Sequence, residues 1–254
     1  MRIRKLKNSE ICFAKDLWQY CFQDSDAFTD WYFARKAGAV LGAFDGERLA
    51  AQLVLAPLAL AVRGERREGR LVSGVSTRPE YRGQGAMGKL LPASYARMRR
   101  EGACIAVLYP FSYGFYRQYG WAVSCDAVRV RTALSDLPVA SLAGGFELVE
   151  ELTGPQLAAL AAIYEDCFAP YSGHVLRGPG DFALRLEELA QDGGFAALYR
   201  RGEAVEGYLL YHFEGKVIAV DELGLLTPEA RRDTLSFLGR HASTMEEAAW
   251  LAPV

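Results

Sequence analysis

The stretch RPEYRGQGAMGKLL, residues 78–91, combines glycine and basic residues in a way that suits a phosphate ligand. Gly83, Gly85 and Gly88 fit the G-x-G-x-x-G pattern of dinucleotide-binding folds, and the same stretch fits most of G-x-x-x-x-G-K, the pattern of nucleoside triphosphate loops. Arg82 and Gly85 fit a third pattern, R-x-x-G. In all three, glycine lets the backbone come close to a phosphate, so that amide groups donate to the ligand.

The first two patterns each lack a residue that their chemistry needs. A triphosphate loop requires Ser or Thr after the lysine to hold magnesium, and this sequence has Leu90 there. A dinucleotide fold requires a strand that runs straight into the first glycine and an acidic residue about 20 positions further on. Here residues 78–82 precede Gly83, and the later region is the apolar segment IAVLY. The R-x-x-G pattern at a helix start therefore accounts best for the stretch, with an ordinary glycine-rich helix cap as the alternative.

Strand and helix patterns on both sides of the loop indicate how it is positioned. Alternating apolar residues predict strands, and apolar residues at helical spacing predict helices. In the first half we expect a strand over 2–7, helices over 11–21 and 28–37, strands over 39–46, 48–62 and 69–77, a helix from the loop to about 101, a strand over 104–111, a short helix over 112–120 and a strand over 121–131.

The second half repeats this order of elements without repeating the residues. We expect a strand over 146–152, helices over 155–168 and 181–192, strands over 194–201, 204–215 and 216–226, and a helix from about 228. The connection over residues 135–145 contains Pro138, Gly144 and Gly145, which interrupt any periodicity. We therefore predict a first domain over residues 1–134 and a second over residues 146–254.

The loops of the two copies differ in one respect that bears on function. The sequence TPE at residues 227–229 stands where the first copy has RPE at residues 78–80, but the glycine cluster is missing. Without glycine, side chains crowd the backbone that must approach a phosphate. The second copy is thus expected to be a degenerate structural copy.

Composition and charge exclude several classes of protein. Apolar residues make up 51% and charged residues 24%, the balance of a globular protein. A net charge of -2 argues against a general nucleic-acid binder, which needs a basic face. The longest apolar run is interrupted by Pro57 and is too short to cross a bilayer as a helix, and no signal-peptide region follows the first residues. We expect a cytoplasmic protein with neither a nucleic acid nor a membrane as partner.

The cysteines and histidines give no pattern of a metal site. Five cysteines occur singly and three histidines lie far apart in the sequence. Reduced, mostly buried thiols are the expected state, rather than a zinc site or a disulfide framework.

Residues 74–91, GVSTRPEYRGQGAMGKLL, resemble the coenzyme A-binding motif of the GNAT N-acetyltransferases, usually R-x-x-G-x-G/A. Met87 departs from it, since Gly or Ala is commoner there. Residues 107–121, VLYPFSYGFYRQYGW, are similar to the aromatic motif of the Eis-like branch (enhanced intracellular survival proteins), whose members carry tandem GNAT domains. The resemblance extends over most of the chain and is specific over residues 74–121.

The resemblance implies an α/β (α+β) protein with tandem GNAT folds, each a mixed, mostly antiparallel sheet flanked by helices. It implies acetyl-coenzyme A as co-substrate, no metal, transfer to a primary amine (aminoglycoside, polyamine or lysine side chain) and a ring-like homo-oligomer. The strand at residues 75–77 would pair with the pantetheine arm, and residues 83–88 would hold the pyrophosphate. The implied cofactor-binding residues are Val75, Ser76, Thr77, Arg82, Gly83, Gln84, Gly85, Ala86, Met87, Gly88, Phe111 and Ser112.

The same resemblance implies one catalytic residue. Tyr116 matches the general acid of the Eis-like branch, and a tyrosine with a pKa of about 10 is protonated at neutral pH. Tyr113 and Tyr119 are interpreted as packing residues. The base in that branch is the C-terminal carboxylate, after a third, sterol-carrier-like domain. This sequence stops at EEAAWLAPV, inside the second GNAT unit, so we assign no base and do not give the role to Val254.

Acidic and aromatic residues near the N-terminus suggest where the amine binds. Asp24, Asp26 and Trp31 lie in the helical region that lines the amine pocket of GNAT folds, and Asp30 lies beside them. Carboxylates near aromatic rings attract a cation, although helix capping and surface solvation explain the same residues. For the whole chain, the competing hypothesis is a non-catalytic acyl-coenzyme A-binding or regulatory module.

Overall fold

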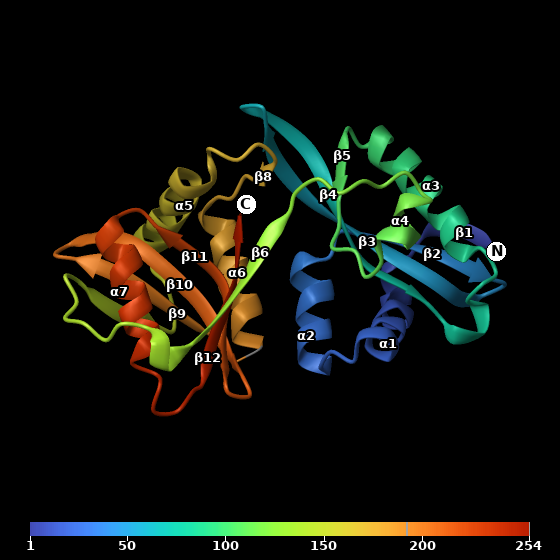
Figure 1. Cartoon of the computed structure of the whole chain (residues 1–254). Coiled ribbons are helices and arrows are strands. Elements are labelled where there is room, and N and C mark those ends of the chain that lie inside the picture. Colours follow the sequence, from blue (N-terminus) through green and yellow to red (C-terminus); the bar gives the residue numbers. More distant parts are fainter. Residues whose placement is uncertain (192, 254) are drawn as a thin grey trace. The chain divides into compact units, whose positions relative to one another are not determined.

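The computed structural model, drawn in Figure 1, describes residues 1–191 and 193–253. It divides into two compact units of mixed α/β structure. The first unit consists of Met1–Ser124 with Ser172–Leu176, and the second of Cys125–Tyr171 with the chain from Arg177 onward. Each unit contains one sheet flanked by helices, as the predicted tandem fold requires.

The first unit is built on a six-stranded sheet. Its strands in spatial order are β1 (Arg2–Lys5), β2 (Ala39–Asp45), β3 (Arg48–Val62), β4 (Glu65–Thr77) and β5 (Ile105–Val107), with β8 (His174–Val175) beside β3. All neighbours pair antiparallel except β4 and β5, which are parallel. The sheet is therefore mixed and mostly antiparallel.

Helices cover both faces of this sheet because its strands alternate two sets of apolar side chains. The helix α3 (Ala86–Arg100) packs Leu90 and Leu91 on the face that carries Leu53, and α1 (Ile11–Phe22) packs Leu17 on the face that carries Val54. In Figure 1, α2 (Asp26–Trp31) lies on the side of α1, and α4 (Tyr113–Arg117) on the side of α3. The predicted second helix continues from α2 as a π-helical turn over Tyr32–Lys36.

Two irregularities shape the end of β4. It pairs with β5 only over Gly69–Leu71, and no described strand pairs with that edge of β4 from residue 72 to its end. Against β3, the register shifts so that Leu53 faces both Gly74 and Val75, a β-bulge. Gly74 has φ +57 and a Cβ there would lie 2.2 Å from the Trp18 ring, so only glycine fits.

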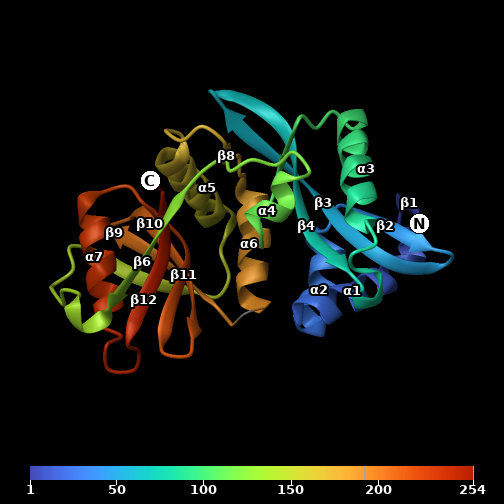
Figure 2. The ribbon, with the colours of Figure 1, turned by 45° about the vertical axis from the view of Figure 1, so that its right-hand side comes forward.

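The second unit is a six-stranded sheet of the same kind. Its order is β6 (Ala127–Ala133), β12 (Glu247–Pro253), β11 (Val217–Leu225), β10 (Ala204–Glu214), β9 (Phe195–Arg201) and β7 (Gly145–Val149), and only β11 and β12 are parallel. The helices α5 (Gly154–Phe168) and α6 (Pro179–Gln191) cover one face and α7 (Pro228–Gly239) covers the other (Figure 2). The predicted end of α6 at residue 192 lies outside the described residues.

The boundary between the units differs from the predicted one. The sequence places the strand over residues 121–131 in the first domain, whereas β6 pairs with β12 along its whole length and so belongs to the second sheet. The boundary therefore falls after Ser124 rather than after residue 134. Residues 135–145, expected as a connection between domains, lie inside the second unit, next to the fully packed side chain of Leu134. The sequence also missed β12, whose small residues give no clear strand signal.

Two further expectations concern thiols and strand length. All five cysteines are free, but Cys12, Cys104 and Cys125 are exposed, so the expectation of mostly buried thiols is wrong. The strand predicted over residues 104–111 has only three residues, and its pairing with β4 ends at Leu71. Within the described residues, His, Cys, Asp and Glu form no cluster of three or more that could hold a metal ion. None of the helices described has the length and apolar character needed to cross a membrane.

Candidate functional site

The glycine loop borders a cavity of about 700 Å³ in the first unit. The unpaired end of β4 forms another wall, and the segment that follows β5 forms a third. The cavity is lined by Cys21, Phe22, Val75, Ser76, Thr77, Tyr81, Arg82, Gly83, Gly85, Ala86, Met87, Phe111, Phe115 and Tyr119. All of the predicted cofactor-binding residues except Gln84, Gly88 and Ser112 are in this set, so the fold brings most of them together.

The loop owes its glycines to backbone conformation rather than to crowding. Gly83 and Gly85 have φ +75 and +74, a region that other residues rarely adopt, and no atom lies within 4 Å of a Cβ built on either. Gly85 is the N-cap of α3 and supplies no side-chain hydrogen bond. The first amide groups of α3, which have no partner within a helix, are therefore uncapped by any side chain and begin at the cavity wall.

This helix end is suited to an anion. Amide donors and the positive end of the helix dipole meet at the N-terminus of α3, and each contact of a charge with that dipole contributes about 0.3–1 kcal/mol at exposed sites. Arg82 adds a cation to the same wall, and its Nε–H donates to the carbonyl oxygen of Thr77 at 3.2 Å. That bond ties the loop to the end of β4.

The unpaired edge of β4 offers backbone hydrogen bonds to an extended ligand. Val75, Ser76 and Thr77 lie beyond the last residue that pairs with β5, and all three line the cavity. A strand edge without a neighbour presents N–H and C=O groups that a ligand in extended conformation can match. Ser76 Oγ is occupied, since it donates to the carbonyl oxygen of Gly74 at 3.1 Å.

The three predicted residues outside the lining have local roles. Gln84 Nε2 donates to the carbonyl oxygen of Glu80 at 2.7 Å and holds the turn before α3. Ser112 is the N-cap of α4, where its Oγ accepts from the amide of Phe115. Gly88 lies in α3 beside the Tyr119 ring, which a Cβ would meet at 3.8 Å.

Tyr116 lies behind the cavity wall rather than in it. Its side chain is 4% exposed, and it is not among the residues that line the cavity. Its ring meets the rings of Phe111 and Phe115 edge-on, with centroids 5.5 and 5.2 Å apart, and both of those rings line the cavity. Burial raises the pKa of the Tyr116 phenol above its usual value, so this group is protonated at neutral pH.

Five lining residues were not predicted from the sequence: Cys21, Phe22, Tyr81, Phe115 and Tyr119. Phe115 lies in α4 and Tyr119 in the turn just after it, and their helical spacing of four residues in the aromatic motif could have identified them as neighbours. Cys21 and Phe22 gave no such signal, because the fold brings the C-terminal end of α1 to the cavity from a distant part of the sequence.

The residues predicted to bind the amine do not line the cavity. Asp24 accepts from Trp18 Nε1 at 2.6 Å, Asp26 accepts from Gln19 Nε2, and Asp30 pairs with Lys15 Nζ at 2.5 Å. All three carboxylates are exposed. The Trp31 ring packs against Phe28, with centroids 6.0 Å apart. These contacts match the alternative interpretation, in which the acids fix helix ends and solvate the surface.

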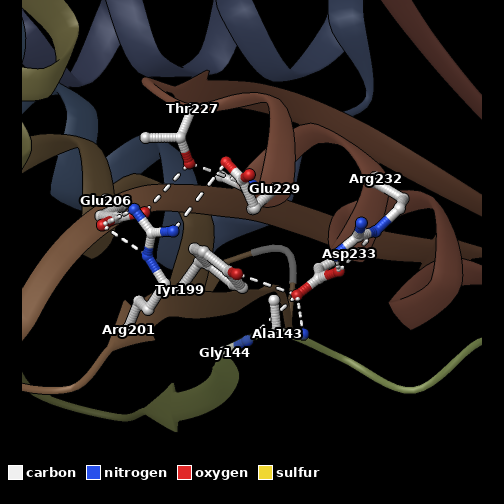
Figure 3. A network of polar contacts seen from close by, with 10 residues as sticks. Ala143, Gly144, Tyr199, Arg201, Glu206, Thr227, Glu229, Arg232 and Asp233 are labelled. Carbon is white, nitrogen blue, oxygen red and sulfur yellow. Dashed lines mark hydrogen bonds and ion pairs between the residues drawn. The ribbon is translucent and has the colours of Figure 1, made fainter.

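The equivalent helix end in the second unit is closed by a side chain. Thr227 is the N-cap of α7, and its Oγ1 accepts from the amide of Ala230 at 3.1 Å while it donates to Glu206 at 3.0 Å. Figure 3 shows Thr227 with Glu206 and, on the same helix, Asp233. One amide at the start of α7 therefore has a side-chain partner, which the start of α3 lacks.

Asp233 holds α7 to the segment before β7. Its carboxylate has no exposed surface and accepts from the amides of Ala143 and Gly144, at 2.7 and 3.1 Å, and from Tyr199 Oη–H at 2.8 Å (Figure 3). Burial by itself would raise the pKa of Asp233, but these hydrogen bonds, with two from Arg232, outweigh it and lower the pKa. Burial and the bond to Asp233 raise the pKa of Tyr199 to about 12.

Two family models match the chain, one in each half. Both are described as an acetyltransferase (GNAT) domain; the first matches residues 2–124 and the second residues 173–254. No curated protein matches the sequence.

Solved structures of low sequence identity share the fold over the whole chain. A probable N-acyltransferase from Enterococcus faecalis is 23% identical with a TM-score of 0.86, and a GCN5-related N-acetyltransferase from Anabaena variabilis is 18% identical with a TM-score of 0.83. Both matches cover 100% of this chain, which spans 65% and 66% of theirs, less than two thirds. Eis1 from Mycobacterium abscessus is 20% identical, with a TM-score of 0.70 over 100% of this chain and 67% of its own.

Proposed function

This chain has two GNAT acetyltransferase domains, and we propose that the first transfers an acetyl group from acetyl-coenzyme A to a primary amine. One observation carries the proposal: the uncapped N-terminus of α3 and the unpaired edge of β4 border a single cavity. Pyrophosphate and an extended amide-containing arm are the two parts of coenzyme A that such groups suit. The second domain, with its closed helix end, serves as a structural copy.

The residues present fit the co-substrate. The loop from Gly83 to Gly88 and the side chain of Arg82 would hold the pyrophosphate, because open space lies beside both positive-φ glycines. The backbone of residues 75–77 would pair with the pantetheine arm, and Phe111 would cover its far side. Bound acetyl-coenzyme A supplies an activated acyl group as a thioester.

The reaction needs an uncharged amine and a proton for the departing sulfur. The amine nitrogen forms a bond to the thioester carbon, the carbon–sulfur bond breaks, and the products are an amide and free coenzyme A thiol. We assign the donor of the sulfur's proton to Tyr116 Oη on the match to the aromatic motif. The phenol packs against Phe111 and Phe115 of the cavity wall, and its raised pKa keeps it protonated until the sulfur leaves. Tyr116 regains a proton as the amine nitrogen loses one to solvent. Positioned proton transfer of this kind contributes about 10²–10⁴-fold.

We place the chain in the Eis-like branch of this superfamily. The aromatic motif over residues 107–121 supports this placement, as does the similarity to Eis1 over the whole chain. The order of two GNAT domains in one chain supports it as well.

Two measurements on the intact chain test the function. Titration calorimetry should show that coenzyme A binds to one site per chain, and a thiol-release assay should show turnover of acetyl-coenzyme A that depends on an added primary amine. Binding without release on any amine would contradict the transferase and support the non-catalytic acyl-coenzyme A-binding module. Absence of binding would contradict both.

A further inference from the structure

Tyr116, the residue to which we assign the proton donor, lies in a helix too short to hold its own position. The helix α4 has five residues and contains Gly114, a poor helix former. A helix of this length is not stable in water by itself, so its place in the fold depends on tertiary contacts. The contacts around α4 therefore determine where the Tyr116 phenol lies.

The turn after α4 folds back against Tyr116. The carbonyl oxygen of Tyr116 accepts from the amides of Tyr119 and Trp121, at 2.9 and 3.3 Å. The Trp121 ring lies edge-on to the Tyr116 ring, with centroids 6.1 Å apart, while the rings of Phe111 and Phe115 contact Tyr116 from the cavity wall. A shift of this turn would therefore move the Tyr116 ring.

Tyr95 ties this turn to α3, the helix that begins at the glycine loop. Its Oη–H donates to the carbonyl oxygen of Tyr119 at 3.0 Å. Its ring lies edge-on to the ring of Trp121, with centroids 6.2 Å apart. Burial raises the pKa of the Tyr95 phenol, so this group remains a donor at neutral pH. One side chain of α3 thus contacts both parts of the turn that supports Tyr116.

We propose that Tyr95 is a positioning residue for proton transfer by Tyr116: its hydroxyl holds the turn at Tyr119 and its ring supports Trp121. The inference rests on the proposed function and adds to it a residue that does not line the cavity. Because α3 also begins at the cavity wall with its uncapped amide groups, a single helix positions both the co-substrate and the proton donor.

The first experiment removes only the hydroxyl of Tyr95. Tyr95→Phe keeps the ring beside Trp121 and loses the bond to Tyr119. Because a displacement of about 1 Å can slow a reaction about 100-fold, we expect this partial loss of support to lower kcat for thiol release about tenfold. The Kd for coenzyme A, measured by calorimetry, should not change. The amine is the best acceptor among spermine, kanamycin, 2-phenylethylamine and a lysine-containing peptide.

Ser94→Ala is the matched control. Ser94 precedes Tyr95 in α3 and is fully buried, and its Oγ–H donates to the carbonyl oxygen of Leu91 at 2.7 Å, within the same helix. Both variants remove a hydroxyl that bonds to a backbone carbonyl, but the Ser94 bond does not reach the turn after α4. Ser94→Ala should therefore leave kcat as in the wild type. Equal kcat losses in the two variants, or no loss in Tyr95→Phe, would overturn the inference.

A double-mutant cycle tests whether Tyr95 acts through Tyr116. If Tyr95 positions the proton donor, Tyr95→Phe should change the kcat of the Tyr116→Phe variant less than about twofold. A further tenfold loss in that background would overturn the inference and leave Tyr116 as the donor. A wild-type kcat in Tyr116→Phe alone would contradict both the donor assigned under the proposed function and its positioning residue.

Hydrogen exchange reports on the turn without any turnover of substrate. The amides of Tyr119, Gly120 and Trp121 donate to carbonyl oxygens of α4, so their exchange measures how often the turn opens. Mass spectrometry of the intact chain should show exchange about fivefold faster over residues 118–121 in Tyr95→Phe, and no change there in Ser94→Ala. If no amine is acetylated, the transferase proposal fails, and unchanged exchange in Tyr95→Phe overturns the present inference independently of that result.

Discussion

The helices α3 and α7 follow equivalent strands of the two sheets, but they differ in how the amide groups at their N-termini are capped. In the first unit the N-cap is Gly85, which contributes no side chain, and the helix begins at the cavity wall. In the second unit the N-cap is Thr227, whose hydroxyl accepts a hydrogen bond from the amide of Ala230 and donates one to Glu206. The first helix end has no side-chain cap, which suits the proposed ligand, and the second uses one of its amides within the fold.

The gap beside each of these strands differs in the same way. In both sheets the parallel pair separates early, after Leu71 in β4 and after Val220 in β11. Beyond that point the first sheet borders the cavity. In the second, Glu222 of β11 pairs with Arg177 at 2.5 Å and accepts from Tyr208 Oη–H at 2.7 Å. Side chains of the second unit thus bond to one another beside the strand that corresponds to β4.

The largest effect is expected from Gly85→Asp. A carboxylate at the N-terminus of α3 would repel a pyrophosphate, so coenzyme A affinity should fall more than about 1,000-fold, or about 4 kcal/mol. Calorimetry of the variant measures this loss. Gly46→Asp is the control, since Gly46 also has positive φ with open space around it but lies in the turn between β2 and β3. Unchanged affinity in Gly85→Asp would mean that the open helix end is not the binding site.

A smaller effect is expected from Tyr116→Phe. Loss of the phenol proton should lower kcat for thiol release about 100-fold and leave the Kd for coenzyme A unchanged. Tyr113→Phe serves as control, because Tyr113 is 64% exposed in the same helix, and its kcat should match the wild type. Equal kcat values for Tyr116→Phe and the wild type would remove Tyr116 from the mechanism.

In the second unit, Asp233→Asn should lower stability without affecting the ligand. An amide in place of the carboxylate loses charge-assisted bonds to Ala143, Gly144 and Tyr199 in a fully buried position, which costs about 2 kcal/mol. Urea unfolding of the intact chain gives the free energy. Coenzyme A affinity should remain as in the wild type. A loss of affinity would show that the second unit also contributes to coenzyme A binding.

The same carboxylate predicts a dependence on pH. The pKa of Asp233 is lowered in the folded protein below its ordinary value of 3.8, so its contribution is complete at neutral pH and is lost as the pH falls through the folded pKa. As the pH falls below about 4, the difference in unfolding free energy between the wild type and Asp233→Asn should narrow. Urea midpoints at pH 7 and pH 3 measure this, and a difference that does not change with pH would exclude the lowered pKa.

The smallest effect is expected from Thr227→Ala. Removal of the cap should destabilise the chain by about 1 kcal/mol, the usual contribution of a threonine N-cap. It should not create a second coenzyme A site, because the segment before α7 lacks the glycine cluster of residues 83–88. Calorimetric stoichiometry decides this point. A rise to two sites per chain would show that the cap alone closes the second loop.

Local patterns in the sequence predicted most elements, including β3 at the same residues as in the structure, as well as the loop that meets the cavity. They also identified the loss of glycine in the second copy. The membership of β6 in the second sheet was not predictable, because pairing with β12 depends on residues more than 110 positions away. The part of the cavity wall formed by Cys21 and Phe22 was missed for the same physical reason. It depends on the face of the first sheet against which α1 packs, which local patterns in the sequence do not determine.

The position of β6 bears on how the two halves of such a chain can be exchanged. If two such genes recombined within residues 135–145, β6 and β12 would be inherited in different halves. A second half without its β6 would expose the edge of β12 as a template for aggregation. A junction next to Ser124 keeps that pair together. Inheritance of the halves as modules, in nature or in chimaeras made in the laboratory, should therefore favour crossovers just before residue 125.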